Sequence, residues 1–261
     1  MKSFDDFMPA CIEIPPPKPL QPEFVDVVND ALDSLRKELG PVLDSLYLYG
    51  SVARGKAQRG KSDLDLTLIL TRSLATHEMR SLERVRSDLQ DRHPEVSKID
   101  FDIGVLEDVL SPDNLYSWGY WLKHECRCIY GTDLALRFKA FQPSRSIAQA
   151  INGDYMQVLG DYVICINAAE GHAEMQRLQK EAARKLLRAT NVLRPLSDSY
   201  WPVSLADYAE YFSASHPEMA HHVEFFLTHA NTPYASSEAF NDKLVFFLAW
   251  MKKCELLSTP A

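Results

Sequence analysis

Apolar residues in the first half of the chain follow two spacings, one typical of helices and one typical of strands. Between residues 23 and 39 they recur at intervals of three and four, which predicts a helix that Gly40 and Pro41 end. Residues 42–49 and 64–70 are short apolar runs and are predicted to be strands. The second run is apolar on nearly every position, as expected for a strand covered on both faces.

The same pattern continues to about residue 140 and then changes. Residues 74–92 carry an apolar helical stripe, and 98–106 and 126–130 are predicted to be two further strands. Beyond Tyr130 only helical spacings appear, at 144–167, 172–193, 204–213, 217–230 and 236–257. The expected fold class is therefore α+β, a mixed sheet with flanking helices followed by an all-helical bundle.

Prolines mark one further segment. They cluster between residues 15 and 22, where they cannot enter a helix interior. We therefore expect a proline-rich arm over 1–21, a sheet domain over 22–140 and a helical domain over 141–261.

Charge and composition narrow the range of partners. The formal net charge of −8 and the pI near 5.5 disfavour a nucleic acid partner and favour a cationic one, although a local basic patch can hide within an acidic total. No apolar run approaches the roughly 20 residues that span a bilayer, and acids near the N-terminus argue against a secretory signal. We expect a cytoplasmic protein whose five scattered cysteines are reduced and mostly buried, rather than a zinc site.

The chemistry concentrates between Tyr49 and Leu66. Gly50 lies where a strand turns into a short helix, and without a Cβ its backbone can approach a ligand closely. Ser51 adds a hydroxyl and an N–H at that helix start, which suits a phosphate. Asp63 and Asp65 are two residues apart at the start of a strand, so their carboxylates project from one face.

Two adjacent carboxylates repel each other unless a cation joins them, and hard oxygen ligands suit Mg²⁺. A phosphate cradle facing such a pair is the minimum equipment for metal-assisted nucleotidyl transfer. Gly50-Ser51 alone would more often be a turn, and Asp63 with Asp65 alone would more often be a turn or a solvent-facing pair. Their combination favours a metal site.

The pattern Gly50-Ser51-Val52-Ala53-Arg54-Gly55 followed by Ser62-Asp63-Leu64-Asp65-Leu66 resembles the signature of the DNA polymerase beta-type nucleotidyltransferase superfamily. A sheet domain followed by a helical bundle is similar to the aminoglycoside nucleotidyltransferases, such as the streptomycin/spectinomycin adenylyltransferases. The resemblance implies a third carboxylate on a neighbouring strand, and Asp100 is favoured over Asp102, which shares its face. Glutamate can occupy this position in the aminoglycoside enzymes, whereas the aspartate here is shorter by one methylene group.

The resemblance also implies residues that bind the nucleotide. Ser62 is expected to contact the β- or γ-phosphate. Residues 54–61 form a basic linker that could steer a triphosphate, and Arg54 is its foremost candidate. The alternative is that this linker is a solvated loop. In the helical domain the family uses basic residues for the triphosphate tail, and the candidates here are Lys180, Lys185 and Arg188. The alternative is a surface helix whose basic residues pair with Glu174 and Glu181. A lysine that relatives place before the helix at 205–208 is absent from 201–204.

Two other groups of side chains have competing interpretations. His124, His216, His221 and His222 have no carboxylate or cysteine set around them and are predicted to be isolated surface histidines. Trp118, Tyr120 and Trp121 could form the floor of an acceptor pocket, but core packing between the domains is favoured.

The hypothesised reaction is in-line attack of an acceptor hydroxyl on the α-phosphorus of a nucleoside triphosphate, with ATP the favoured donor. Two Mg²⁺ ions are expected, one on Asp63, Asp65 and Asp100 and one on Asp63, Asp65 and phosphate oxygens. The favoured acceptor is a small aminoglycoside-like cation. The alternatives are a protein or RNA acceptor, as in toxin–antitoxin pairs, and a catalytically inactive scaffold.

Overall fold

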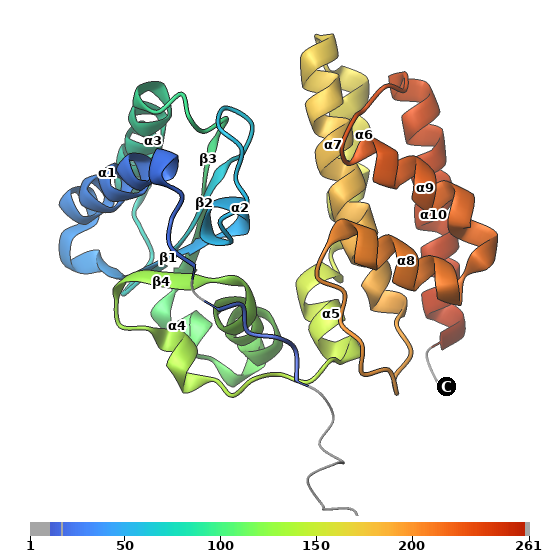
Figure 1. The fold of residues 1–261 in the computed structure, drawn as a ribbon, viewed down its shortest axis with the longest axis horizontal. Helices are drawn as coiled ribbons and strands as arrows, with labels where there is room; N and C mark the ends of the chain where they lie inside the picture. The colour runs from blue at the N-terminus through green and yellow to red at the C-terminus, as the bar shows by residue number, and fades with distance from the viewer. Residues whose placement is uncertain (1–10, 17, 259–261) are drawn as a thin grey trace, which may run out of the picture. The chain divides into compact units, whose positions relative to one another are not determined.

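The computed structural model describes residues 11–16 and 18–258, and the chain folds into two compact units (Figure 1). The sheet unit comprises residues 11–141, and the helical unit begins at residue 142. Each unit has its own hydrophobic core. Within the described residues, none of the helices combines the length and apolar character needed to cross a membrane.

The sheet unit contains one mixed four-stranded sheet with the order β3-β2-β1-β4. Its strands are β1 (Leu43–Tyr49), β2 (Leu64–Leu70), β3 (Ile99–Val105) and β4 (Arg127–Gly131). β1 pairs antiparallel with β2 and β4, whereas β2 pairs in parallel with β3. The predicted α+β class with a mixed sheet is confirmed, and β2 is a central strand buried along its length.

Alternation along the strands gives the sheet two different faces. One face carries the leucines of β1 and β2 and packs against α1 (Pro22–Leu39) and α3 (Thr76–Arg92), which together form the main core. α1 begins at a proline, and its buried positions recur at three- and four-residue spacing from Phe24 to Leu39. Both helices therefore cover the face that bears no acidic residue of the site.

The opposite face is polar at one end and apolar at the other. Its apolar end is a smaller core built on Tyr47 and Ile69, with Val109, Leu122 and Leu134 packed against them. Val109 belongs to α4 (Leu106–Val109), and Leu134 to a short 3-10 helix after β4, Leu134–Arg137. Leu122 lies in the second of two wide π-helical turns, Leu115–Gly119 and Trp121–Glu125. The sequence pattern did not predict these turns, whose period matches neither of the two spacings used.

The helical unit contains six α-helices within its described residues. They are α5 (Arg145–Asn152), α6 (Tyr155–Ala168), α7 (His172–Ala189), α8 (Leu205–Ser215), α9 (Ala220–His229) and α10 (Ser237–Ser258). The single helix predicted over 144–167 is in fact two helices. The N–H of Gly153 closes α5 on Gln149, and a new turn begins at Asp154 because glycine and aspartate are poor interior helix formers.

Arg194 anchors the connection between α7 and α8. Its side chain is 2% exposed, and its Nη2 donates to the carbonyl oxygens of Asp198 and Tyr200 at 2.9 and 2.7 Å. The guanidinium also lies over the Trp201 ring, 4.9 Å from its centroid. A buried cation with carbonyl acceptors thus fixes a loop that has no regular secondary structure.

His124 joins two distant ends of the sheet unit and is 2% exposed, so the prediction of a surface histidine is wrong for this residue. Its Nε2 accepts from the N–H of Phe141 at 3.0 Å, and its Nδ1 donates to the Glu13 carbonyl at 3.1 Å. The Ile12 N–H donates to the Phe141 carbonyl at 2.8 Å. Burial lowers the pKa of His124, in keeping with a neutral ring.

The cysteines are free but less buried than predicted. Cys11 and Cys165 are exposed, and Cys126, Cys128 and Cys254 are intermediate. Cys11 lies outside the strands and helices, and Cys165 lies on an exposed side of α6. The prediction of mostly buried thiols is therefore wrong. The sequence pattern around a lone cysteine does not determine which way its side chain points.

Candidate active site

Carboxylates gather where β1, β2 and β3 meet on the polar end of the second sheet face. Tyr49 on β1 pairs with Asp65 on β2, and Asp65 pairs with Asp100 on β3. Residues paired across neighbouring strands project from the same face, so the two carboxylates are neighbours. Asp63 lies two residues before Asp65, and the exposed Asp102 follows Asp100 at the same spacing.

Asp65 is the most buried carboxylate of this group and lies against the backbone of Gly50. A Cβ placed on Gly50 would lie 2.0 Å from Asp65 Oδ2, and the φ of Gly50 is +71°. Only glycine fits this position, because a side chain would collide with the carboxylate and strain the backbone. Burial, followed by the negative charges of Asp63 and Asp100, raises the pKa of Asp65 to about 7.

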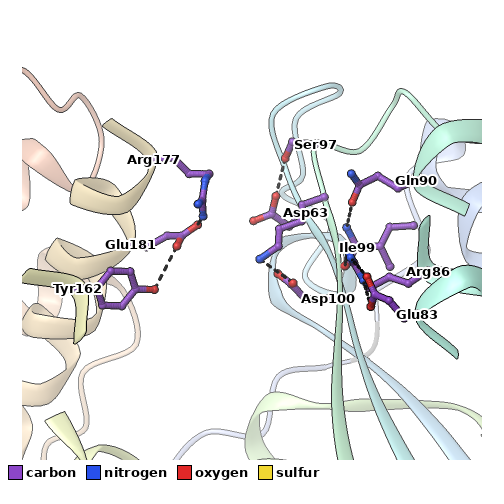
Figure 2. A network of polar contacts seen from close by, with 11 residues as sticks. Asp63, Glu83, Arg86, Gln90, Ser97, Ile99, Asp100, Tyr162, Arg177 and Glu181 are labelled. Atoms are coloured by element: carbon purple, nitrogen blue, oxygen red, sulfur yellow. Dashed lines mark hydrogen bonds and ion pairs between the residues drawn. The ribbon is translucent and has the colours of Figure 1, made fainter. Parts of the chain in front are cut away.

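Asp63 is held by a serine from the segment that leads into β3. Ser97 Oγ donates to Asp63 Oδ1 at 2.5 Å, as Figure 2 shows, and the Ser97 N–H donates to the carbonyl of Ser62 at 3.0 Å. This pair of bonds joins the stretch before β2 to the stretch before β3. Asp63 therefore has a fixed orientation although it lies outside a strand.

Asp100 forms an ion pair with Lys98. Lys98 Nζ lies 2.8 Å from Asp100 Oδ1, and the two side chains are 41% and 37% exposed. The spacing of two residues on a strand puts both side chains on one face, which is a signal that the sequence did contain. The Lys98 charge also lowers the pKa of Asp65, against the larger effects that raise it.

Helix α3 fixes the backbone between Lys98 and Asp100. Gln90 Oε1 accepts from the Ile99 N–H at 3.3 Å, and Arg86 Nη1 donates to the Ile99 carbonyl at 3.3 Å (Figure 2). A helix on the apolar face thus determines where β3 begins. The position of Asp100 on the opposite face follows from that anchor.

A divalent cation fits this group of donors by its chemistry. Carboxylate oxygens are the ligands that Mg²⁺ prefers. Burial first and the neighbouring negative charges second raise the pKa of Asp65, and a bound cation would offset both effects. Over residues 11–16 and 18–258, no three His, Cys, Asp or Glu side chains are already grouped closely enough to hold a metal ion. Two of the carboxylates have protein partners instead, because Asp63 is bonded to Ser97 and Asp100 to Lys98.

The predicted phosphate-binding residues lie beside these carboxylates, but two of them have protein partners. Gly50 and Ser51 begin the short helix α2 (Gly50–Ala53) directly after β1. Arg54 forms an ion pair with Glu125, which also accepts from the Tyr120 hydroxyl at 3.0 Å. Ser62 Oγ accepts from the backbone N–H of Gln58 at 2.9 Å.

The aromatic residues after β3 pack within the sheet unit. Trp121 Nε1 donates to Thr67 Oγ1 at 3.1 Å, and the Trp121 ring meets Tyr49 edge-on with centroids 4.8 Å apart. Burial and a hydrogen bond to Asp102 raise the pKa of Tyr49. Trp118 packs against the smaller core. The favoured interpretation was packing between the domains, whereas both tryptophans pack against the core of the sheet unit itself.

The basic residues predicted to bind the triphosphate tail lie on α7 in the helical unit. Lys185 Nζ pairs with Asp154 at 2.7 Å, whereas Lys180 is partly buried and Arg188 is exposed. One turn earlier, Arg177 pairs with Glu181 at 2.8 Å, and Glu181 also accepts from Tyr162 (Figure 2). The alternative of a helix with internal ion pairs is realised at Glu181.

Comparison with known proteins agrees with this geometry. Residues 28–113, which include Gly50, Asp63, Asp65 and Asp100, match the family model of the nucleotidyltransferase domain. This stretch is therefore similar to the nucleotidyltransferase domain over about a third of the chain. No curated protein sequence matches the chain at a significant level.

The fold of most of the chain resembles that of a solved nucleotidyltransferase. The crystal structure of spectinomycin adenyltransferase AAD(9) from Enterococcus faecialis, determined with ATP and spectinomycin, matches with a TM-score of 0.61 and 15% sequence identity. The match covers 87% of this chain and 98% of that chain. The predicted resemblance to the polymerase beta-type nucleotidyltransferases and the aminoglycoside adenylyltransferases is confirmed.

Proposed function

We propose that this protein transfers a nucleoside monophosphate, AMP from ATP, to a hydroxyl of a small cationic acceptor related to the aminoglycosides. The observation that carries the proposal is the alignment of Asp65 with Asp100 across β2 and β3, with Gly50 in contact with Asp65. A close-approach glycine and neighbouring carboxylates are the elements that bring a triphosphate and its cation together. The nucleotidyltransferase match over residues 28–113 supports this assignment.

In the proposed mechanism, Gly50 and Ser51 hold phosphate oxygens through backbone N–H groups and the Ser51 hydroxyl. Asp63, Asp65 and Asp100 would hold Mg²⁺, which when bound lowers the pKa of the acceptor hydroxyl and offsets charge on the leaving pyrophosphate. Asp100 accepts the proton of the acceptor hydroxyl, and it must first part from Lys98. Asp65 must be deprotonated to bind a cation, which a pKa of about 7 allows near neutral pH.

The charge of the chain supports a cationic acceptor. The formal net charge is −8, and the exposed Asp102 adds a further carboxylate beside Asp100 on the same sheet face. The structure of AAD(9), which shares this fold, was determined with spectinomycin as well as ATP. An amine-bearing acceptor would be attracted to this face, whereas an anionic one would be repelled.

The test is pyrophosphate release from each of the four ribonucleoside triphosphates with Mg²⁺, across a panel of aminoglycosides and aminocyclitols. We expect release that depends on one class of acceptor and is lost in Asp63→Asn and Asp65→Asn, because each variant removes a cation ligand. Asp91→Asn, which removes one exposed carboxylate from α3, is the matched control and should retain activity.

The outcomes separate the alternatives. Triphosphate binding with Mg²⁺ but no release across the panel would replace the small acceptor with a protein or RNA. Undiminished release by Asp63→Asn would overturn the assigned site. Absence of any triphosphate binding would overturn the nucleotidyltransferase activity itself and favour a scaffold.

A further inference from the structure

Lys98 places a protein-borne cation among the carboxylates of the candidate active site. Its Nζ lies 2.8 Å from Asp100 Oδ1, a distance typical of a charge-assisted hydrogen bond. No sequence motif singled out Lys98. Its position follows from the start of β3, one residue before Ile99.

The Lys98 backbone is fixed on both sides, so only its side chain is free to leave the carboxylate. Its carbonyl accepts from the Leu64 N–H at 2.9 Å. The next residue, Ile99, is held by Gln90 and Arg86 of α3. The Lys98 side chain is 41% exposed, and a flexible four-carbon stem can swing into solvent without disturbing the strand.

The charge of Lys98 reaches more than one carboxylate. Asp65 is surrounded by Asp63, Asp100 and Asp102, which all raise its pKa, whereas Lys98 lowers it. The ammonium therefore offsets part of the repulsion that a cation would otherwise relieve. A lysine in this place acts on the same carboxylates as the metal of the proposed function.

We propose that Lys98 is a tethered counter-ion that competes with a divalent cation for Asp100. It is a positioning residue, which holds Asp100 when the metal is absent and must release it when the metal binds. The inference rests on the proposed function, because it takes Asp63, Asp65 and Asp100 as the metal ligands. It implies that the divalent cation binds weakly without a nucleotide, since displacing Lys98 opposes binding until phosphate oxygens add further ligands.

The test is a titration of the nucleotide-free protein with Mn²⁺, following the electron paramagnetic resonance signal of the free ion. We expect Lys98→Gln to bind Mn²⁺ about threefold to tenfold more tightly than the wild type, from the loss of a partly exposed ion pair. Lys98→Arg keeps the charge and should restore the wild-type affinity. Lys37→Gln on α1 changes the net charge equally at an exposed position and should leave Mn²⁺ affinity unchanged.

Two results would overturn the inference. One is unchanged or weaker Mn²⁺ binding by Lys98→Gln, and the other is an equal gain in Lys37→Gln, which would assign the effect to net charge. The gain should also shrink as salt is raised, because screening weakens the ion pair that is being removed.

Asp65→Asn separates this inference from the proposed function. If Asp65→Asn loses Mn²⁺ binding while Lys98→Gln matches the wild type, only the role of Lys98 fails. If Asp65→Asn binds Mn²⁺ as well as the wild type, even with a non-hydrolysable ATP analogue present, the assigned metal ligands fail and Lys98 loses its role with them.

Discussion

Gly50→Ala is the substitution whose effect on the site follows most directly from the structure. The added Cβ would lie 2.0 Å from Asp65 Oδ2 and 3.0 Å from its Cγ. An ordinary van der Waals contact at a Cβ begins at 3.4 Å, so the carboxylate oxygen must move by about 1.4 Å. The substitution therefore displaces a proposed cation ligand without altering any ionisable group.

Two effects of this substitution have separate magnitudes. A φ of +71° in an alanine costs roughly 1–2 kcal/mol of folding free energy, because the Cβ crowds the following carbonyl oxygen. In enzymes, misplacing a reacting or ligating group by about 1 Å lowers the reaction rate about 100-fold. We therefore expect a folded variant, modestly less stable, with at least a 100-fold loss of nucleotidyl transfer.

Gly55→Ala is the matched control. Gly55 also has a positive φ, +63°, but the atoms nearest to its added Cβ are 3.9 Å away. This variant should show a similar loss of stability in urea denaturation without moving Asp65. Its transfer activity and its affinity for the Mg²⁺–triphosphate complex should remain within a few-fold of the wild type.

The assay combines urea denaturation, calorimetric binding of the Mg²⁺–triphosphate complex and pyrophosphate release. Wild-type release by Gly50→Ala would refute the reasoning, since it would mean that the position of Asp65 does not matter. Equal losses of activity in Gly50→Ala and Gly55→Ala would also refute it, because backbone strain alone would then explain both.

Three further predictions concern charged groups inside the two units. The folded-state pKa of Asp65 is about 7, so the folded chain retains a proton that the unfolded chain releases near pH 4. The free energy of unfolding of the metal-free protein should therefore fall as the pH rises from about 4 to about 7. Asp65→Asn should recover up to about 4 kcal/mol of it at pH 8, as measured by urea titration. The pKa of His124 is lowered below its ordinary value of 6.5, so the neutral ring stabilises the fold above pH 6.5. This contribution should be lost as the pH falls from 6.5 through the lowered folded-state pKa. The loss should appear in urea titrations of the wild type and be absent from those of His124→Gln. Arg194→Met should lower the free energy of unfolding by about 3–5 kcal/mol, because the carbonyls of Asp198 and Tyr200 lose their donor; a change below about 1 kcal/mol would contradict this.

Local sequence patterns were enough to predict the elements that carry the site. β2 begins and ends where the apolar run predicted, because a central strand is buried along its length and flanked by polar residues. Asp65 and Asp100 lie on one face of the sheet, as the strand period of two predicts for paired residues, whereas Asp63 precedes β2. These features depend on neighbours in the sequence, which a single chain displays.

The partners of these residues could not be predicted, because they depend on contacts between distant segments. Arg54 pairs with Glu125, 71 residues away, and Asp63 accepts from Ser97, 34 residues away. His124 is buried because a carbonyl and an N–H from two other segments satisfy its ring. No spacing along the chain reveals such pairings. The contact between Lys98 and Asp100 could have been predicted, because residues two apart on a strand project from the same face.

The hydrogen bond between Ile12 and Phe141 has a consequence for how this protein can be rearranged. This bond of 2.8 Å joins the two ends of the sheet unit, so the points where the chain enters and leaves that unit lie next to each other. A circular permutation that links residue 141 to residue 11 through a short glycine-rich connector would keep β1 to β4 in their present order within the sheet. The sheet unit, which carries the proposed site, could in this way be joined to a different neighbouring domain without redesign of its own core.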